Sequence, residues 1–186
     1  MIGIDIEYFN HENITMISIF QISSLTDDYI VDCLSVNLKA MKKYIQPLLY
    51  NQNIIKIMHG SDNDLILVKS LFNLSLINFI DTSRLDIELR ENKFDLRGLA
   101  TLTQQYMGIA MSKEYQVSEW RIRPIPKAML QYAKKDSAIL PFLLVKMMDK
   151  ISNDTERIRQ MILGGCKQVR KNKKATQPLI SGVRTL

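Results

Sequence analysis

The order of apolar patterns along the chain constrains its fold more than any other feature. Apolar and polar residues alternate from residue 2 and again over residues 14–23, and a third run begins at residue 29. A period of two is typical of β-strands, and the closeness of the first two runs favours a hairpin. Two short apolar runs, 54–58 and 79–80, predict buried strands further along the chain.

Helical patterns separate and follow these short runs. One begins near residue 38, one after Ser61 and Asp62, and one directly after Asp81 and Thr82. Another spans residues 96–106, and the last begins at Lys127. A proline removes one helical hydrogen bond, so Pro141 predicts a kink or a restart in the last of these helices. Strands that first form a hairpin and then alternate with helices predict an α/β fold with a mixed sheet.

Composition limits the class of protein. The 186 residues suit one domain with a short appendage, and 46% apolar residues can form a buried core. The apolar runs are too short to span a bilayer, and the first residues lack the pattern of a secretion signal. Cys33 and Cys166 are too few for a disulfide framework and lack zinc-ligand spacing, so we expect an intracellular protein without a membrane partner.

The net charge of +6 comes from the end of the chain. Residues 155–186 hold eight Lys or Arg and one Glu, which leaves 17 basic and 18 acidic residues in 1–154. A basic tail favours polyanions. Because exposed basic tails without a partner are about as common, this tail alone does not decide for nucleic-acid binding.

Asp5 and Glu7 are the first candidates for chemistry. They stand two apart on the first predicted strand, so both carboxylates lie on one face while Ile4 and Ile6 lie on the other. Neighbouring acids repel each other, and a cation between them relieves the repulsion. A solvated acidic strand face gives the same pattern, and for the pair alone that interpretation is favoured.

Two further groups of polar residues follow. Tyr132 and Asp136 are four apart on a predicted helix, so their side chains share one face. Asp62 and Asp64 fall in the first turn of another helix, where the helix dipole alone favours acids. Each group has an ordinary structural explanation, but the three in this order along the chain make a stronger pattern than any one of them.

The stretches that contain these residues resemble a known family. They are IDIE, MISIFQIS, KIMHGSDNDL, NFIDTSRL, SKEYQVSEWRIRPIP and MLQYAKKD. Together they resemble the RNase D family of DEDDy 3′-5′ exonucleases, and most closely its eukaryotic branch, the exoribonucleases associated with the nuclear exosome. The resemblance implies an RNase H-like (DnaQ-like) fold, with a mixed sheet of five to six strands flanked by helices.

The resemblance also predicts the domain organisation. Residues 1–152 are expected to form the exonuclease domain. Residues 153–186 are expected to form a helical end, closed by Gly164 and Gly165, and a basic flexible tail. That segment is too short for the helical HRDC domain of the family, which we therefore expect to be absent.

The site implied by the resemblance consists of four acids and a tyrosine: Asp5, Glu7, Asp64, Tyr132 and Asp136. The four acids are the implied metal ligands. Carboxylates without His or Cys suit hard cations, so the set predicts two divalent ions, Mg²⁺ or Mn²⁺, for displacement at a phosphodiester. The tyrosine, with a pKa near 10 in water, is expected to orient a water rather than to deprotonate it.

Nearby polar residues are expected to have structural roles. Asp64, not Asp62, is the matching acid because it directly precedes the apolar part of its helix. Asp62 and Asp81 are predicted to cap helices, His59 to pack at a strand end, and Trp120 to pack within the WRIRP segment as part of the scaffold.

The implied substrate is single-stranded RNA with a free 3′ end, and the implied products are nucleoside 5′-monophosphates. Lys113 is the preferred candidate for a phosphate contact, ahead of Arg121 and Arg123. Two positions depart from the exosome-associated relatives: Tyr8 stands where they usually have histidine, and Leu67 where they often have tryptophan. Both are implied to lie near the terminal nucleotide, so base stacking and rate are expected to differ.

Two other functions remain open at this point. A DNA 3′-5′ exonuclease uses the same acids, and a catalytically weak RNA-binding subunit can share the nuclease fold. Inactive members normally lose acids, whereas this chain keeps all four. The resemblance further implies RNA exosome subunits as candidate partners and a nuclear location.

Overall fold

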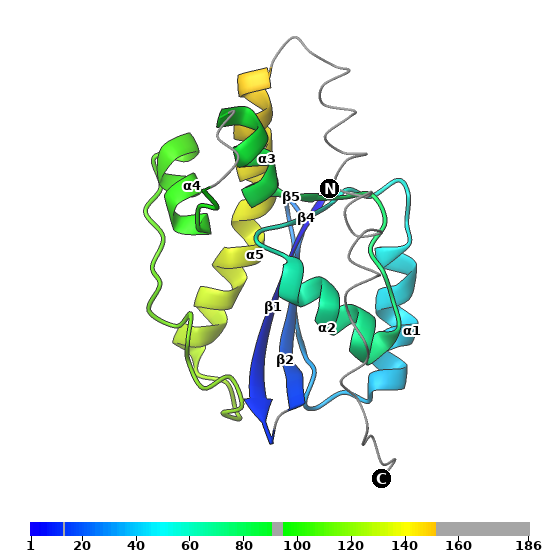
Figure 1. Ribbon diagram of the computed structural model, residues 1–186. Helices are drawn as coiled ribbons and strands as arrows, with labels where there is room; N and C mark the ends of the chain where they lie inside the picture. Colours follow the sequence, from blue (N-terminus) through cyan, green and yellow to red (C-terminus); the bar gives the residue numbers. More distant parts are fainter. Residues whose placement is uncertain (13, 91–94, 152–186) are drawn as a thin grey trace.

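In a computed structural model, residues 1–12, 14–90 and 95–151 are described, and they form one sheet with helices on both faces (Figure 1). The strands are β1 (Ile2–His11), β2 (Ile14–Ser23), β3 (Asp28–Asp32), β4 (Lys56–Met58) and β5 (Phe79–Asp81). The helices are α1 (Leu38–Leu49), α2 (Asp62–Phe72), α3 (Thr82–Arg90), α4 (Leu99–Met107), α5 (Lys127–Met148) and the short 3₁₀ helix η1 (Asp149–Ile151). The helical end and basic tail expected at 153–186 lie outside the described residues.

The sheet is mixed, as the sequence predicts. Its strand order is β3-β2-β1-β4-β5. The first three strands pair antiparallel, whereas β4 and β5 run parallel to β1. The strand that carries the first two acids, β1, is therefore the central one.

Two apolar layers hold the helices on the sheet. On one face α1 and α2 cover the isoleucines of β1, namely Ile2, Ile4 and Ile6. On the other face α3, α4 and α5 cover β4 and β5, with Ile57, Leu102 and Leu140 buried between them. No helix in the described part of the chain is both long and apolar enough to cross a membrane.

Strand alternation divides β1 between these two layers. Because Ile2, Ile4 and Ile6 face α1 and α2, the intervening residues Gly3, Asp5 and Glu7 face α5. The register between β1 and β2 shifts between Glu7 and Tyr8, which is the mark of a β-bulge. Bulges redirect side chains and are frequent beside active sites.

Of the two outcomes predicted for Pro141, a kink or a restart, the restart does not occur, since α5 continues through it from Lys127 to Met148. Proline has no N–H, so the carbonyl of Ser137 loses its helical partner. That carbonyl faces β1 instead: a Cβ atom added to Gly3 would lie 2.0 Å from the Ser137 oxygen. The bare backbone at residue 3 therefore allows α5 to lie close against the central strand.

Candidate active site

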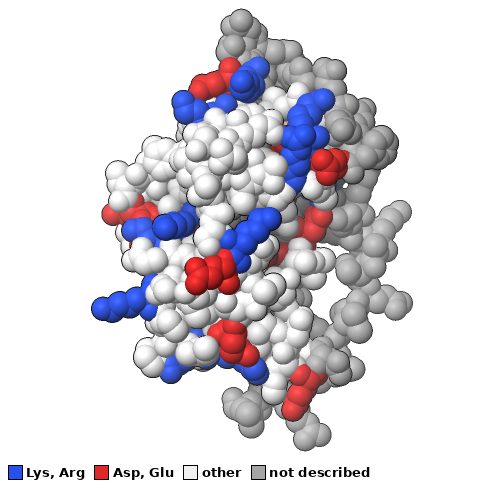
Figure 2. Space-filling view, turned by 90° about the vertical axis from the view of Figure 1, so that its left-hand side faces the viewer, with Lys and Arg blue, Asp and Glu red and all other residues white. Residues whose placement is uncertain are grey.

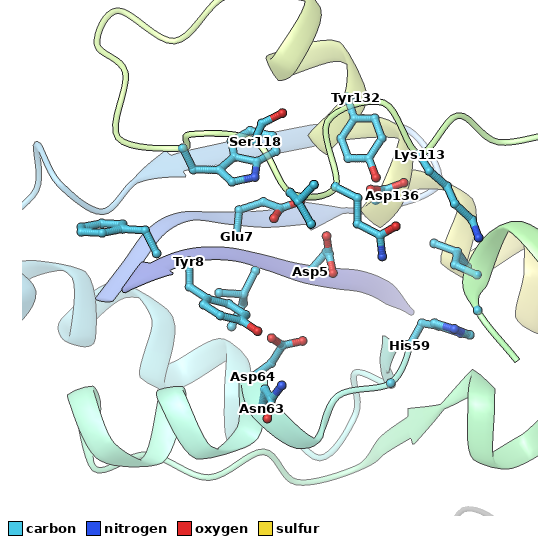
Figure 3. A pocket seen from close by; sticks show the side chains of 18 of the residues that line it. Asp5, Glu7, Tyr8, His59, Asn63, Asp64, Lys113, Ser118, Tyr132 and Asp136 are labelled. Atoms are coloured by element: carbon cyan, nitrogen blue, oxygen red, sulfur yellow. The ribbon is translucent and has the colours of Figure 1, made fainter. Parts of the chain in front are cut away.

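An open cleft of about 670 Å³ lies above the acid-bearing end of β1. Its walls come from β1, the start of α2, residues 98–100, the connection 111–121 and α5. Asp5 and Glu7 extend from the strand, Asp136 and Tyr132 from α5 on one side, and Asp64 from α2 on the other (Figure 3). Every acid that the sequence singles out as a ligand reaches this cleft.

Three carboxylates from two elements meet at its floor. One oxygen from each of Asp5, Glu7 and Asp136 lies within 4.8 Å of the others. The strand spacing of Asp5 and Glu7 places both on one face, and the close packing of α5 on Gly3 brings Asp136 toward them. Three acids so arranged can hold a metal ion.

The mutual repulsion of these acids and their burial disfavour ionisation. Burial raises the pKa of Asp5 to about 6. The pKa of Glu7 rises to about 9 because of burial and the negative charges of Asp5, Asp136 and Asp64. Burial and the charge of Asp5 raise the pKa of Asp136 to about 7. Without a cation the cluster therefore favours partial protonation.

This cluster predicts how the stability of the metal-free protein depends on pH. A carboxyl whose pKa is raised by folding contributes stability below its unfolded pKa, and this contribution is lost as pH rises through the folded pKa. From about pH 6.5 to about pH 8.5, Asp136 and then Glu7 release protons in the folded state. We expect the Tm, measured in EDTA by differential scanning fluorimetry, to fall by about 5 °C over this interval.

Two comparisons isolate the cause of that fall. Added Mn²⁺ should remove most of it, because cations neutralise the negative charges, and Asp136→Asn should lessen it in EDTA, while Glu7, whose pKa is raised first by burial, keeps the rest. The interval lies below the ordinary pKa of cysteine and tyrosine, whose shifts at Cys33 and Tyr106 act at higher pH. A Tm in EDTA that stays constant or rises across the interval would contradict the proposed repulsion.

Tyr132 lies beside this cluster with its proton retained. Its hydroxyl donates a hydrogen bond to Asp136. Burial and the neighbouring carboxylates raise the pKa of Tyr132 well above its ordinary value. The ring is held by Tyr115 and Trp120, with ring centroids 5.8 Å and 6.4 Å away. The residue can position a water but cannot serve as a base near neutral pH.

Asp64 lies across the cleft from the three-carboxylate group and is not part of it. Only 8% of its surface is exposed. Burial, followed by the negative charges of Asp5 and Asp81, raises its pKa well above the ordinary value. Asp62, two residues earlier, instead forms an ion pair with Arg84 at the surface.

The start of α2 is held by Asp81 at the end of the neighbouring strand β5. Its carboxylate accepts hydrogen bonds from the backbone N–H groups of Gly60 and Ser61, at 3.1 and 2.8 Å, and from the hydroxyl of Ser61. It also accepts bonds from the backbone and side chain of Ser83. These bonds lower the pKa of Asp81. Asp81 thus caps helices rather than facing the cleft, as the sequence predicts.

The predicted substrate contacts divide into two groups. Tyr8 and Lys113 line the cleft, and Figure 3 shows Tyr8 extending toward Asp64. Leu67 does not reach it: the side chain is 6% exposed and packs in the core between α2 and the sheet. A leucine at this position buries its apolar side chain instead of projecting into the polar cleft.

Several cleft residues escape sequence reasoning. Asn63, His59 and Ser118 face the cavity in Figure 3, and Val117 lines it with 96% of its surface exposed. His59 forms a 2.9 Å hydrogen bond between Nδ1 and Thr82, so it is tethered as well as accessible. Of these residues, Asn63 adjoins Asp64 in the sequence, and His59 stands in the same HGSDNDL stretch but had been predicted to pack at a strand end rather than to line the cleft.

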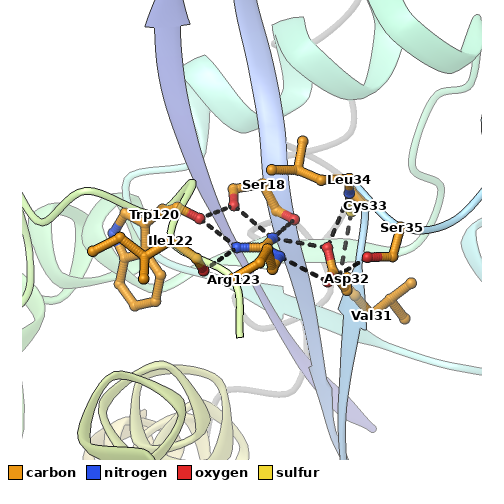
Figure 4. A network of polar contacts seen from close by, with 9 residues as sticks. All are labelled: Ser18, Val31, Asp32, Cys33, Leu34, Ser35, Trp120, Ile122 and Arg123. Atoms are coloured by element: carbon orange, nitrogen blue, oxygen red, sulfur yellow. Dashed lines mark hydrogen bonds and ion pairs between the residues drawn. The ribbon is translucent and has the colours of Figure 1, made fainter. Parts of the chain in front are cut away.

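The WRIRP segment acts as scaffold, as predicted. Arg123 binds both carboxylate oxygens of Asp32 at 2.7 Å and also donates to the backbone oxygens of Ser18 and Trp120 (Figure 4). Arg123 holds the pKa of Asp32 at about 2. Trp120 is buried, with 2% exposure. This network fixes one wall of the cleft to β2 and β3.

Positive charge is sparse around the cleft. Among the described residues that line it, Lys113 and Arg121 are the Lys or Arg side chains. Arg121 already binds the carboxylate of Glu119, and its guanidinium lies 5.4 Å from the centre of the Phe9 ring. On the face shown in Figure 2, Lys and Arg are interspersed with Asp and Glu rather than gathered in one basic patch.

Comparisons with known proteins agree with this arrangement. A family described as 3′-5′ exonuclease matches residues 1–155. Exosome complex component 10 of Rattus norvegicus is 32% identical over 146 residues, which are 78% of this chain and 16% of that protein. The catalytic core of RRP6 from Trypanosoma brucei is 27% identical, with a TM-score of 0.73 over 87% of this chain and 42% of that chain.

A more distant structure confirms the fold. RNase D of Escherichia coli superposes with a TM-score of 0.79 over 95% of this chain and 45% of that chain, at 20% identity. The predicted RNase H-like mixed sheet is therefore correct. With its family match over most of its length, this chain belongs to the 3′-5′ exonuclease family.

Proposed function

We propose that residues 1–152 form the catalytic domain of a metal-dependent 3′-5′ exoribonuclease. The observation that carries the proposal is the meeting of Asp5, Glu7 and Asp136 on the floor of an open cleft, with Asp64 across from them. Membership in the exonuclease family supports the reaction. Similarity to exosome complex component 10 and to RRP6 supports RNA as the substrate and RNA processing or decay as the role.

The donor set fits divalent cations. All four acids offer oxygen ligands, and no Cys or His stands among them, so Mg²⁺ or Mn²⁺ is favoured over zinc. The raised pKa values of Glu7 and Asp136 point the same way, because neighbouring negative charges add to the effect of burial and positive charge relieves them. We propose that Asp5, Glu7 and Asp136, with Asp64 across the cleft, would hold two such ions.

The residues divide the work of one displacement. Bound cations supply positive charge to the attacking water and the departing oxygen. The Tyr132 hydroxyl, which stays protonated, orients the water toward the terminal phosphorus. The water oxygen bonds to phosphorus and releases a proton to solvent, the bond from phosphorus to the 3′ oxygen breaks, and that oxygen takes up a proton from solvent. A nucleoside 5′-monophosphate leaves, and the RNA is one nucleotide shorter.

The cleft fits an unpaired 3′ end. Lys113 is placed to neutralise a backbone phosphate of the terminal nucleotides. The phenol ring of Tyr8, which is 37% exposed, offers a stacking surface for a base. Exosome subunits as partners and a nuclear location are proposed from the same relatives.

Asp64 and Asp62 provide a matched test of the site, because they lie two residues apart on one helix turn. Asp64→Asn should lower the rate of RNA shortening by about 100-fold, the upper range for a group that acts on a metal partly through water. Asp62→Asn should stay within about twofold, since Asp62 pairs with Arg84 at the surface. Equal losses in single-turnover assays would contradict the assignment of Asp64.

The direction and the substrate are tested with 5′-labelled single strands of one sequence, in RNA and in DNA. The proposal expects a ladder of products that shorten by single nucleotides from the 3′ end, with RNA degraded faster. A faster reaction on DNA would favour a DNA exonuclease. RNA that binds but stays intact in Mg²⁺ and in Mn²⁺ would favour an inactive RNA-binding subunit.

A further inference from the structure

Gln21 is a buried amide that the site described so far does not use. It lies on β2 with 0% of its surface exposed. Within the part of the chain that the structure describes, neither its Nε2 nor its Oε1 has a hydrogen-bond partner. Burying an unpaired amide costs about 1–3 kcal/mol, so most buried polar groups are paired. Such a group indicates a partner that becomes available in another state of the protein.

The neighbours of Gln21 are well defined by the sheet. In the register of β1 and β2, Gln21 pairs directly with Asp5. On its other side it pairs with Ile30 of β3. Directly paired residues of antiparallel strands share one face, with Cβ atoms about 5 Å apart. Gln21 therefore lies on the same face as Asp5, beneath α5.

The other polar groups around it are already engaged. Two residues after Gln21 on β2, the hydroxyl of Ser23 is hydrogen-bonded to that of Ser137 on α5 at 2.7 Å. Two residues before Gln21 on the same strand, Ile19 packs on Ala133 of α5. Between these apolar and satisfied neighbours, the carboxylate of Asp5 is the polar group that the register places beside the amide.

One further unpaired atom belongs to a residue of the cleft. Among the described residues, the buried side-chain N and O atoms without a partner belong to Gln21 and to the indole of Trp120. Trp120 lines the cleft and packs on Tyr132. Each of the two residues is thus linked to the acid site, Trp120 through Tyr132 and Gln21 through its strand pairing with Asp5.

We propose that Gln21 is a positioning residue for the metal site, whose side-chain amide donates a hydrogen bond to the Asp5 carboxylate when the site holds cations. The inference rests on the proposed function. A carboxylate has about four lone-pair positions, so Asp5 can accept from Gln21 and still bind cations. Hydrogen bonds to an ionised acceptor are about twice as strong as neutral ones. The amide of Gln21 thus orients the carboxylate of Asp5, a proposed metal ligand, without touching the RNA.

Gln21→Met tests the proposal, because methionine keeps the length of the side chain and removes its polar atoms. Loss of a group that orients a metal ligand typically weakens metal binding and activity by about 10- to 100-fold. By isothermal titration calorimetry we expect Mn²⁺ to bind Gln21→Met at least about tenfold more weakly than the wild type. The kcat for RNA should fall similarly at fixed Mn²⁺, with KM unchanged.

The metal-free protein separates positioning from packing. Because the substitution removes an unpaired amide, the Tm of Gln21→Met in EDTA should equal or exceed that of the wild type. Gln21→Leu, a second apolar variant, should behave in the same way. Gln131→Met, the same exchange at an exposed position of α5, should leave Mn²⁺ binding and kcat unchanged.

Each outcome decides one question. Wild-type Mn²⁺ affinity and kcat in Gln21→Met would overturn the positioning role while leaving the proposed function intact. A lowered Tm in EDTA in both Gln21 variants, with Mn²⁺ affinity lost in parallel, would assign Gln21 to packing and also overturn it. A wild-type protein that neither binds Mn²⁺ nor shortens RNA would instead reject the proposed function.

Discussion

Replacing Asp5 with Asn is expected to lower the rate of RNA shortening by at least about 1000-fold, or about 4 kcal/mol of transition-state stabilisation. Asp5 is the residue whose charge raises the pKa of Glu7, Asp64 and Asp136. It therefore lies at the electrostatic centre of the site, where its carboxylate would be a ligand of the bound cations. Single-turnover assays with excess enzyme measure the loss without interference from product release.

The same variant should be more stable than the wild type in EDTA. Asparagine removes a negative charge from a cluster of acids but keeps the shape of the side chain, so the repulsion decreases. A higher Tm together with lost activity would show that Asp5 is retained for chemistry and not for folding. Asp149→Asn, an exposed acid on η1, is the matched control and should change neither value. Activity within tenfold of wild type in Asp5→Asn would refute the role of Asp5.

Gly3→Ala is expected to be the most damaging substitution outside the acids. The added methyl would meet the Ser137 oxygen at 2.0 Å and both Leu140 and Pro141 at 3.1 Å. The first contact is with backbone, so α5 itself has to move away from β1. Overpacking of this kind costs about 1–3 kcal/mol or more. A shift of about 1 Å at Asp136 lowers catalysis by about 100-fold.

Measurements on this variant should show linked losses. We expect a lower Tm in EDTA, weaker Mn²⁺ binding and slower RNA shortening, because the same helix carries Asp136 and Tyr132. Gly98→Ala is the control: no atom lies within 4 Å of the added Cβ, and φ at this residue is −70°, which alanine adopts readily. It should cost less than about 1 kcal/mol. A Gly3→Ala protein with the Tm and activity of the wild type would contradict the close contact of α5 with β1.

Much of the fold was predictable because its signals are local. Alternation of apolar residues predicted the hairpin of β1 and β2, and short apolar runs predicted β4 and β5. Pro141 shows where local reasoning failed. The rule that proline ends a helix ignores what the freed carbonyl of Ser137 can contact, and here that contact is made with a glycine 134 positions earlier in the chain.

The cleft was predictable in its ligands and less so in its walls. Spacing and order drew attention to Asp5, Glu7, Asp64 and Asp136, the family resemblance singled them out as ligands, and the structure brings them into one cleft. Leu67 had been expected there by analogy with relatives that carry a large aromatic residue, but a leucine reaches the core instead.

The wall residues escaped prediction for a physical reason. Val117 and Ser118 lie on a connection without periodicity, whose course depends on distant contacts such as that between Arg123 and Asp32. Gln21 was equally hidden, because its position beside Asp5 follows only from the register of two strands.

Metal dependence tests the central claim most directly. A 5′-labelled single-stranded RNA is incubated with the wild type in EDTA, after addition of excess Mn²⁺, and in parallel with Asp136→Asn and Mn²⁺. We predict intact RNA in EDTA, a ladder of single-nucleotide steps once Mn²⁺ is present, and intact RNA with the variant. Shortening that persists in EDTA, or that Asp136→Asn carries out at the wild-type rate, would contradict the account, because the carboxylates would then not drive the reaction.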